Sequence, residues 1–513
     1  MKLLKIARQK NSLPETATRA PKGSLAKFWR TNPNRSTSKE RRSMSQFDLV
    51  IKNGVVATAS DTFKCDIAIR DGKIVQMGDN LSGGAQQIDA AGKYVLPGGI
   101  DSHVHISQPS GEGIVMADDF ESGTLSALFG GNTTIMPFCL QEKGTPLRET
   151  LKDYHDQAEG KCYTDVSFHL IICDPTQAVL GQDLPALIAD GYTSLKVFMT
   201  YEDLRLDDAA ILRTLDVARD TGATVMVHCE NEDAIRFLIE KHEKVGDVAP
   251  RTHATTRPVA VEREATHRAL ALAEVVDVPI VIVHVSNGEA RDEISRARSR
   301  GSKVVGETCP QYLMLTADDL DGMDWEGAKF VCSPPPRDKA AQAECWRGIE
   351  TGVFDLFSSD HCPFRYDDPQ GKRTPKGLTS FRHIPNGIPG VETRMPILFS
   401  EGVMKGRIDI NRFVAMTSTN HAKTYGLYPQ KGTIAIGADA DIAIWDPAEK
   451  RTVRHADLHD GSDYSPYEGL ELTGWPTTIV LGGKVMVRDG ILTGQKGDGR
   501  YRPAHNRLFP ASV

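Results

Sequence analysis

Two histidines separated by one residue follow an apolar stretch, in Gly98-Gly99-Ile100-Asp101-Ser102-His103-Val104-His105. The residues from Tyr94 to Ile100 are typical of a buried strand that leads into this pair. Alternate residues of a strand share a face, so His103 and His105 are expected to point the same way. Two imidazoles aimed at one point suit a metal ion, because neutral imidazole is a favoured ligand. On this pattern alone, two ordinary polar residues on a strand face are an equally good interpretation.

Further polar residues accompany other apolar runs of the chain. His228 and His284 each end such a run, Asp360 ends another, and Lys196 lies inside the run from Ser194 to Phe198. A lysine within an apolar strand costs several kcal/mol unless it is neutralised or paired. A single histidine after a strand is usually structural. Four histidines, one lysine and one aspartate in equivalent positions instead indicate a shared centre.

Six such ligands can hold two divalent metal ions. Lys196 would bridge the ions if its amine had reacted with carbon dioxide to form a carbamate, since that converts a costly buried ammonium into an anionic oxygen ligand. Two metal ions that share a hydroxide lower its pKa and polarise a carbonyl group. Asp360 would then ligate one ion and carry a proton to a leaving nitrogen. The predicted chemistry is two-metal hydrolysis.

The middle of the chain alternates strand-like and helix-like segments. Such an alternation can bring the six candidate ligands together at the ends of neighbouring strands. Eight such units predict a (β/α)8 barrel, whose chemistry gathers at the carboxyl ends of the strands. A doubly wound sheet is the alternative architecture. No GxGxxG or GxxxxGK[ST] loop follows a strand, which disfavours nucleotide binding. The apolar runs are Tyr94 to Ile100, Thr133 to Phe138, Val166 to Ile172, Ser194 to Phe198, Ala223 to Val227, Pro279 to Val283, Lys303 to Gly306 and Phe354 to Phe357.

Both ends of the ordered chain have short alternating strands with glycine turns. An Asp71-Gly72 turn between two such strands is a hairpin signature. Similar strands recur at Asp441 to Trp445 and Thr478 to Val487. These segments predict one small β-sandwich domain built from both chain ends. The expected boundaries are an extension at 1–44, the sandwich at 45–96 and 429–490, the barrel at 97–428, and a C-terminal tail at 491–513.

Composition restricts the classes of protein that this chain can belong to. Its 513 residues are 40% hydrophobic and 25% charged, with a net charge of -7, which indicates neither nucleic-acid nor membrane binding. The nine cysteines include no CxxC pair, which favours a reducing compartment, and we expect the cytoplasm. The basic stretch Met1 to Ser43 is predicted to be disordered. We interpret it as an upstream extension, with an organelle transit peptide as the alternative.

The ordered motifs together resemble a known family. The set His103-Val104-His105, Lys196, His228, His284 and Asp360 is similar to that of the binuclear metal amidohydrolase superfamily. Several phrases between about Phe47 and Gly490 resemble its dihydropyrimidinase/hydantoinase branch more closely. They are Leu195-Lys196-Val197-Phe198-Met199-Thr200-Tyr201, His228-Cys229-Glu230-Asn231, Cys309-Pro310-Gln311-Tyr312, Cys332-Ser333-Pro334-Pro335, Ser359-Asp360-His361-Cys362-Pro363-Phe364 and Ile384-Pro385-Asn386-Gly387.

This resemblance implies a fold, a cofactor and an activity. The fold is a barrel plus a β-sandwich, and the cofactor is two divalent metal ions, typically zinc, bridged by an N6-carboxylated Lys196. The activity is hydrolysis of the cyclic amide bond of dihydropyrimidines or 5-substituted hydantoins to N-carbamoyl amino acids. Tyr201 would hydrogen-bond the developing oxyanion, and Ser333 and Asn386 would bind the ring amide through backbone groups. Homotetramers or homodimers are also implied.

Departures from the family pattern bear on the substrate. Dihydroorotases have an arginine shortly after the histidine pair, whereas this chain has Ile106-Ser107-Gln108-Pro109, which disfavours that substrate. The loop Pro109 to Met116 differs from the usual hydantoinase loop and is expected to shape the pocket for the ring substituent. An allantoinase-type cyclic amidase is one alternative. A non-catalytic assembly protein of the same fold is another, although the intact ligand set argues against it.

Several neighbouring residues have less specific patterns. His361 is expected either to orient a ligand or to serve a structural role, and His383 is a weaker candidate of the same kind. The run from Asp118-Asp119 to Gly130-Gly131 predicts a capped helix. The four cysteines near the predicted centre lack a partner base and are interpreted as packing residues; they are Cys229, Cys309, Cys332 and Cys362.

Overall fold

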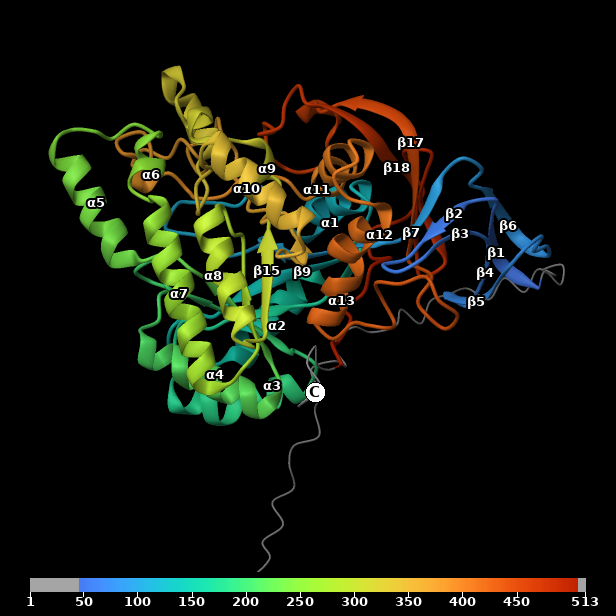
Figure 1. Cartoon of the computed structure of the whole chain (residues 1–513), viewed down its shortest axis with the longest axis horizontal. Coiled ribbons are helices and arrows are strands. Elements are labelled where there is room, and N and C mark those ends of the chain that lie inside the picture. Colours follow the sequence, from blue (N-terminus) through green and yellow to red (C-terminus); the bar gives the residue numbers. More distant parts are fainter. Residues whose placement is uncertain (1–45, 506–513) are drawn as a thin grey trace, which may run out of the picture.

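The computed structural model describes residues 46–505, and the predicted N-terminal extension lies outside this range (Figure 1). Its larger part is a barrel of parallel strands surrounded by helices. The barrel strands are β8 (Gly99–Val104), β9 (Asn132–Leu140), β10 (Asp165–Val166), β11 (His169–Ile171), β12 (Ser194–Phe198), β13 (Thr224–His228), β14 (Ile280–Ile282), β15 (Val304–Thr308) and β16 (Leu356–Phe357).

The strands follow one another around the barrel in chain order. Both β10 and β11 pair with β9 and so share one position, which gives eight positions within residues 46–505. A parallel bridge between Val104 and His361 joins the first position to the segment after the last. The predicted (β/α)8 barrel is confirmed, and the alternative of a doubly wound sheet is wrong.

Helices connect successive barrel strands and cover the outside of the barrel (Figure 1). The predicted capped helix is α1, in which Asp119 accepts hydrogen bonds from the backbone N–H groups of Glu121 and Ser122. The α-helices are α1 (Phe120–Phe129), α2 (Leu147–Ala158), α3 (Leu184–Ala189), α4 (Asp208–Thr221), α5 (Glu232–Lys244), α6 (Thr252–Thr255), α7 (Val259–Val276), α8 (Gly288–Ser299), α9 (Gln311–Met314), α10 (Lys339–Glu350), α11 (Arg394–Leu398), α12 (Ile410–Val414) and α13 (Asn420–Thr424).

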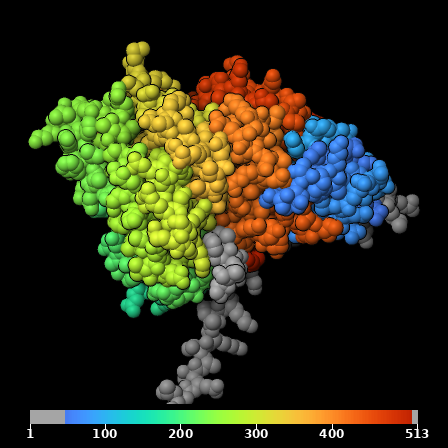
Figure 2. Space-filling view, in the orientation of Figure 1, coloured from blue at the N-terminus to red at the C-terminus, as the bar shows by residue number. Residues whose placement is uncertain are grey.

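Two further sheets form the predicted β-rich part from both chain ends. One has the order β5-β4-β1-β6 and the other β20-β19-β18-β17-β7-β2-β3. Leu49, Ile67, Ile442 and Val480 are among the buried residues between them. In Figure 2, the strands near the start of the described chain, drawn in blue, lie beside later segments drawn in orange at one end of the molecule. The strands are β1 (Phe47–Lys52), β2 (Val55–Ala57), β3 (Thr62–Lys64), β4 (Asp66–Arg70), β5 (Lys73–Gly78), β6 (Gly84–Asp89), β7 (Tyr94–Pro97), β17 (Ile442–Thr452), β18 (Glu471–Leu481), β19 (Lys484–Arg488) and β20 (Ile491–Leu492).

The run from Tyr94 to Ile100 is two strands rather than the expected one. β7 belongs to the seven-stranded sheet, whereas β8 begins the barrel. The chain passes from β7 to β8 at Gly98 and Gly99. Neighbouring residues lie so close to these two glycines that a side chain at either position would clash. A Cβ at Gly98 would lie 2.1 Å from Thr133, and one at Gly99 would lie 2.2 Å from Met395. Close packing of these two glycines against β9 and α11 therefore marks the point at which the run divides.

The amino ends of the barrel strands are joined to the C-terminal segment by ion pairs around the buried Asp165. Lys431 Nζ lies 2.5 Å from an Asp165 carboxylate oxygen and also pairs with Asp441. Arg502 Nε lies 2.6 Å from the same carboxylate. Tyr501 and Val166 form a parallel β-bridge. Residues near the end of the described chain thus pack onto the barrel.

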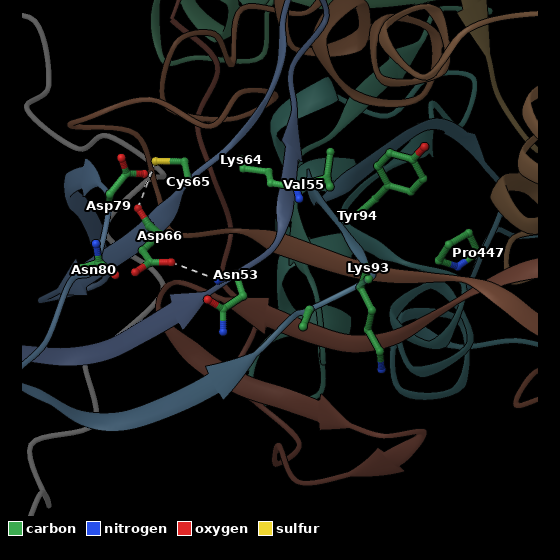
Figure 3. A pocket seen from close by; sticks show the side chains of 12 residues that line it. Asn53, Val55, Lys64, Cys65, Asp66, Asp79, Asn80, Lys93, Tyr94 and Pro447 are labelled. Carbon is green, nitrogen blue, oxygen red and sulfur yellow. Dashed lines mark hydrogen bonds between the residues drawn. The ribbon is translucent and has the colours of Figure 1, made fainter.

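A cavity of about 630 Å³ lies in the β-rich part, away from the ends of the barrel strands (Figure 3). Its lining includes Lys64, Cys65 and Asp66. The Asp66 carboxylate accepts hydrogen bonds from the backbone N–H groups of Asn53 at 2.9 Å and Leu81 at 3.0 Å. This carboxylate therefore has a structural partner on each side.

Among the described residues, no helix has the length and apolar composition needed to cross a membrane.

Candidate metal centre

The six predicted ligands lie together at the carboxyl end of the barrel. His103 is in β8 and His105 follows it, Lys196 is in β12, and His228 ends β13. All six are buried, since none has more than 9% of its surface exposed. The remaining two, His284 and Asp360, follow β14 and β16. The parallel strands bring residues from five different segments to one point.

His103 Nε2 lies near the middle of this group. It is 3.2 Å from Lys196 Nζ and 3.1 Å from Asp360 Oδ1. The same aspartate oxygen is 3.6 Å from His105 Nε2. One ligand atom from each of His103, His284 and Asp360 lies within 4.8 Å of the others. The side chains converge at the separations expected of groups that share metal ions.

The other two histidines face each other. His284 Nε2 lies 2.9 Å from His228 Nδ1. On its opposite side, the His228 ring has its Nε2 atom 2.8 Å from a carboxylate oxygen of Glu230. In the tautomer protonated on Nε2, the His228 ring would donate a hydrogen bond to that carboxylate. Its Nδ1 atom would then carry a lone pair directed into the centre.

The outer ring nitrogens of the first pair are held in the same way. His103 Nδ1 lies 2.7 Å from Glu307 Oε1, and His105 Nδ1 lies 2.8 Å from Gln108 Oε1. Acceptors of this kind fix the ring so that the other nitrogen, Nε2, faces inward with its lone pair free. The structure therefore presents a set of imidazole lone pairs suited to a divalent cation.

Lys196 is fully buried against aromatic rings. Its Nζ atom lies 4.9 Å from the ring centre of Phe138 and 5.2 Å from that of Phe198. Burial lowers its pKa to about 8, although the nearby Asp360 and Glu307 act in the opposite direction. A lowered pKa leaves more of the amine neutral, the form that reacts with carbon dioxide. The environment of Lys196 fits a carboxylated lysine, and the whole donor set fits two metal ions.

Three non-glycine residues at this end have left-handed backbone conformations. Their φ angles are 67° at Tyr201, 39° at His284 and 51° at Asp360. Such conformations cost of order 1–3 kcal/mol each and gather at functional sites, where the surrounding structure holds them. The strain lies at two predicted ligands and at the predicted oxyanion donor.

The three predicted substrate-binding residues border the same centre. The Tyr201 ring lies 5.4 Å from that of His228, and its hydroxyl is beside Ser333. Ser333 Oγ lies 3.4 Å from Asn386 Oδ1. Burial raises the pKa of Tyr201, while Arg257, with its guanidinium 5.9 Å from the ring centre, opposes the rise. Tyr201 thus keeps its hydroxyl proton and can donate it in a hydrogen bond.

Known proteins with similar sequences and structures point to one family. Residues 94–486 match the amidohydrolase family, and residues 24–93 match the N-terminal domain of the urease alpha subunit. The chain belongs to the amidohydrolase family. It is 45% identical to a D-hydantoinase of Rhizobium radiobacter, over 89% of this chain and 98% of that protein. It is 47% identical to a D-hydantoinase of Geobacillus stearothermophilus, over 88% and 95% of the two chains.

A solved structure agrees with these relatives. The dihydropyrimidinase of Brevibacillus agri NCHU1002 superposes with a TM-score of 0.87 at 44% identity, covering 90% of this amidohydrolase and 99% of that chain. The predicted resemblance to the dihydropyrimidinase/hydantoinase branch is therefore confirmed.

The structure also resolves the less specific patterns in this amidohydrolase. His361 Nε2 lies 2.8 Å from Asp118 Oδ2, and its Nδ1 accepts from the backbone N–H of Gly390 at 3.0 Å. The His361 side chain thus ties two loops together rather than orienting a ligand, and His383 is exposed. The four nearby cysteines are unpaired, and burial raises the pKa of each thiol. This suits their predicted packing role.

Sequence reasoning missed several residues that support the centre. Glu307 and Gln108 hydrogen-bond the predicted ligands His103 and His105, and Glu230 was recognised only as part of a motif. The signal for Glu307 was available, because an acidic residue in the apolar run Val304-Val305-Gly306-Glu307-Thr308 needs a buried partner. Arg257, which lies beside Tyr201, is outside the barrel strands and carried no comparable signal.

Proposed function

We propose that this amidohydrolase hydrolyses the cyclic amide bond of hydantoins or dihydropyrimidines to give N-carbamoyl amino acids. The observation that supports this most directly is the convergence of six buried ligand side chains beside Tyr201. The names of its relatives, D-hydantoinase and dihydropyrimidinase, point to the same substrate class.

The proposed cofactor is two divalent metal ions, with zinc as the expected metal. His103 and His105 would hold one ion and His228 and His284 the other. A carboxylated Lys196 would bridge both, and Asp360 would bind the ion held by the first pair. When bound, such ions supply Lewis acidity that polarises a carbonyl group and makes water acidic.

The residues around the centre would bind and orient the ring. Backbone groups of Ser333 and Asn386 would pair with the ring amide, which places the carbonyl carbon toward the ligand cluster. Tyr201 would donate a hydrogen bond to the carbonyl oxygen as negative charge develops there. Such a donor is worth about 3–4 kcal/mol in a transition state. The loop Pro109 to Met116 would contact the ring substituent.

Asp360 would move the proton. Burial acts to raise the pKa of its carboxyl, but the neighbouring His103, His105 and His284 outweigh burial and hold the pKa well below its usual range. The ionised carboxylate would accept a proton from the attacking water and deliver it to the departing ring nitrogen. The ring C–N bond breaks, and the carbonyl carbon becomes a carboxylate.

We place the domain boundaries near residues 97 and 429, supported by the change of sheet at Gly98. We expect the chain to act on a small molecule as a homotetramer or homodimer, as the family resemblance implies. The nine cysteines, unpaired in the described structure, support the cytoplasm as its compartment.

Metal analysis and a substrate panel test this proposal together. Wild type should carry two metal ions and open hydantoin, 5-substituted hydantoins or dihydrouracil faster than allantoin. Lys196→Ala should lose metal and turnover, whereas Lys423→Ala, at an exposed lysine, should keep both. Full metal and full activity in Lys196→Ala would disprove the bridged centre. Preference for allantoin would favour the allantoinase alternative, and a metal-free protein without turnover would favour the assembly protein.

A further inference from the structure

Lys372 is a second fully buried lysine near the barrel mouth, distinct from the ligand cluster. None of its surface is exposed. Its Nζ atom donates hydrogen bonds to two backbone carbonyl oxygens, of Val331 at 2.8 Å and of Pro385 at 2.6 Å. These acceptors lie more than fifty residues apart in the chain. The amine therefore joins two separate segments.

Both acceptors lie within two residues of a residue proposed to bind the substrate. Val331 comes two residues before Ser333, and Pro385 comes immediately before Asn386. A backbone hydrogen bond of 3.0 Å from Gly387 to the Val331 carbonyl joins the same segments. The Lys372 amine therefore adds two hydrogen bonds between the amide-binding stretches to the Gly387 backbone bond and the 3.4 Å contact of Ser333 Oγ with Asn386 Oδ1.

The segment that carries Lys372 also accepts backbone hydrogen bonds from the end of the predicted specificity loop, Pro109 to Met116, and from the residue after it. The backbone N–H of Val115 donates to the Gln370 carbonyl at 2.8 Å, and that of Ala117 donates to the Pro363 carbonyl at 2.8 Å. Lys372 itself is fixed by a 2.7 Å hydrogen bond from its backbone N–H to the carbonyl of Arg365. Residues 363–372 therefore contact both the end of the loop Pro109 to Met116 and, through Lys372, the amide-binding segments.

The surroundings of Lys372 suit an amine that donates hydrogen bonds to the Val331 and Pro385 carbonyls, not an amine in an ion pair. Among the described residues, no carboxylate pairs with its amine, and its Nζ atom lies 5.9 Å from the ring centre of Phe364. Burial lowers the pKa of Lys372 to about 7. A neutral amine has two N–H donors, which equals the number of its carbonyl acceptors.

We propose that Lys372 is a positioning residue that fixes the amide-binding segments around Ser333 and Asn386 relative to each other. Through residues 363–372 it would also set the place of the specificity loop. This inference rests on the proposed function for its kinetic consequence. The effect should fall on substrate binding, because Lys372 contacts neither the ligand side chains nor Tyr201.

Kinetics of Lys372→Met on the best substrate of the panel test this inference. Met fills similar space without a donor, so KM should rise about tenfold, while kcat changes less and metal content stays at the wild-type level. Lys372→Arg, which keeps N–H donors, should recover part of the loss. An unchanged KM in a folded, metal-loaded Lys372→Met enzyme would overturn the inference, as would equal losses in both variants.

Lys431→Met is the matched control, because Lys431 is also buried but lies at the other end of the barrel. It should lower stability and leave KM unchanged. Hydrogen exchange of the wild type and Lys372→Arg gives a readout that needs no turnover, and it also serves if Lys372→Met does not fold. Exchange in Lys372→Arg should be faster at the backbone amides of residues 331–333 and 386–388 than in wild type, because the larger guanidinium displaces the two acceptor segments even though it keeps N–H donors. If wild type opens no ring, the proposed function fails, and exchange alone decides the role of Lys372: unchanged exchange overturns it.

Discussion

The Nδ1 atom of His103 lies 2.7 Å from the Oε1 atom of Glu307, and neither side chain is exposed beyond 1%. The same carboxylate accepts a hydrogen bond from the backbone N–H of His284 at 3.1 Å and from the hydroxyl of Ser358 at 2.7 Å. Burial acts to raise the pKa of Glu307, but His103, the Ser358 hydroxyl and Lys196 outweigh it and lower this pKa to about 2. One ionised carboxylate thus orients ligands from two barrel strands.

Glu307→Gln should therefore weaken metal binding without removing a ligand. The amide can still accept from one neighbour but no longer carries the charge that orients His103, so metal affinity should fall about 10–100-fold. Metal content after dialysis against graded chelator concentrations measures this. Glu392→Gln is the control, since Glu392 is a buried glutamate that pairs with His459 away from the centre. Equal metal retention in the two variants would contradict the assigned role of Glu307.

Tyr201→Phe should mainly lower kcat. The substitution removes the hydroxyl proposed to stabilise the oxyanion, and loss of one such donor costs about 10²–10³ in kcat. KM should change little, because the hydrogen bond strengthens only as charge develops. Steady-state kinetics with hydantoin measures both constants. Tyr464→Phe is the control, as the Tyr464 hydroxyl is buried without a hydrogen-bond partner among residues 46–505. A Tyr201→Phe enzyme with wild-type kcat would exclude the oxyanion role.

Residue periodicity and strand-end chemistry predicted much of this molecule. His103, His228 and Asp360 were recognisable because polar groups at the ends of apolar strands need a common explanation, and Lys196 because a lysine inside such a strand needs a partner. The barrel followed from the same alternation of strand and helix. These features depend on local sequence, and so they can be seen before the fold is known.

Contacts between distant segments could not be predicted in the same way. Lys372 and Val331 lie forty-one positions apart, and no pattern in either segment indicates that they meet. The division of the first apolar run at Gly98 depends likewise on Thr133, a residue of the next barrel strand. Such relationships arise from tertiary packing, which periodicity does not describe.

The buried amine of Lys372 should make stability depend on pH. Burial lowers its pKa from an ordinary 10.5 to about 7 in the folded chain. Between these values the unfolded chain binds more protons than the folded chain, so the free energy of unfolding rises with pH. The slope from this residue is at most about 1.4 kcal/mol per pH unit. Below about pH 7 both states are protonated, and the contribution becomes constant.

Urea unfolding of wild type and Lys372→Met across the alkaline range measures this slope. The variant lacks the titrating amine, so its stability should rise less steeply with pH between about 7 and 10. Lys423→Met, at an exposed lysine, should follow wild type. Parallel pH profiles for wild type and Lys372→Met would mean that Lys372 is protonated in the folded chain.

Lys431→Met should destabilise the fold without changing the chemistry. Lys431 Nζ is 2.5 Å from an Asp165 oxygen, pairs with Asp441, and lies 3.4 Å from Asp439. Its removal would leave buried carboxylates with too few cations, which costs about 3–5 kcal/mol. Denaturant unfolding measures the loss, with Lys423→Met as the exposed control. Kinetic constants of the folded enzyme should match wild type, because this cluster lies at the amino ends of the strands and the ligands lie at the carboxyl ends. A loss below about 1 kcal/mol would show that the carboxylates are neutralised without Lys431.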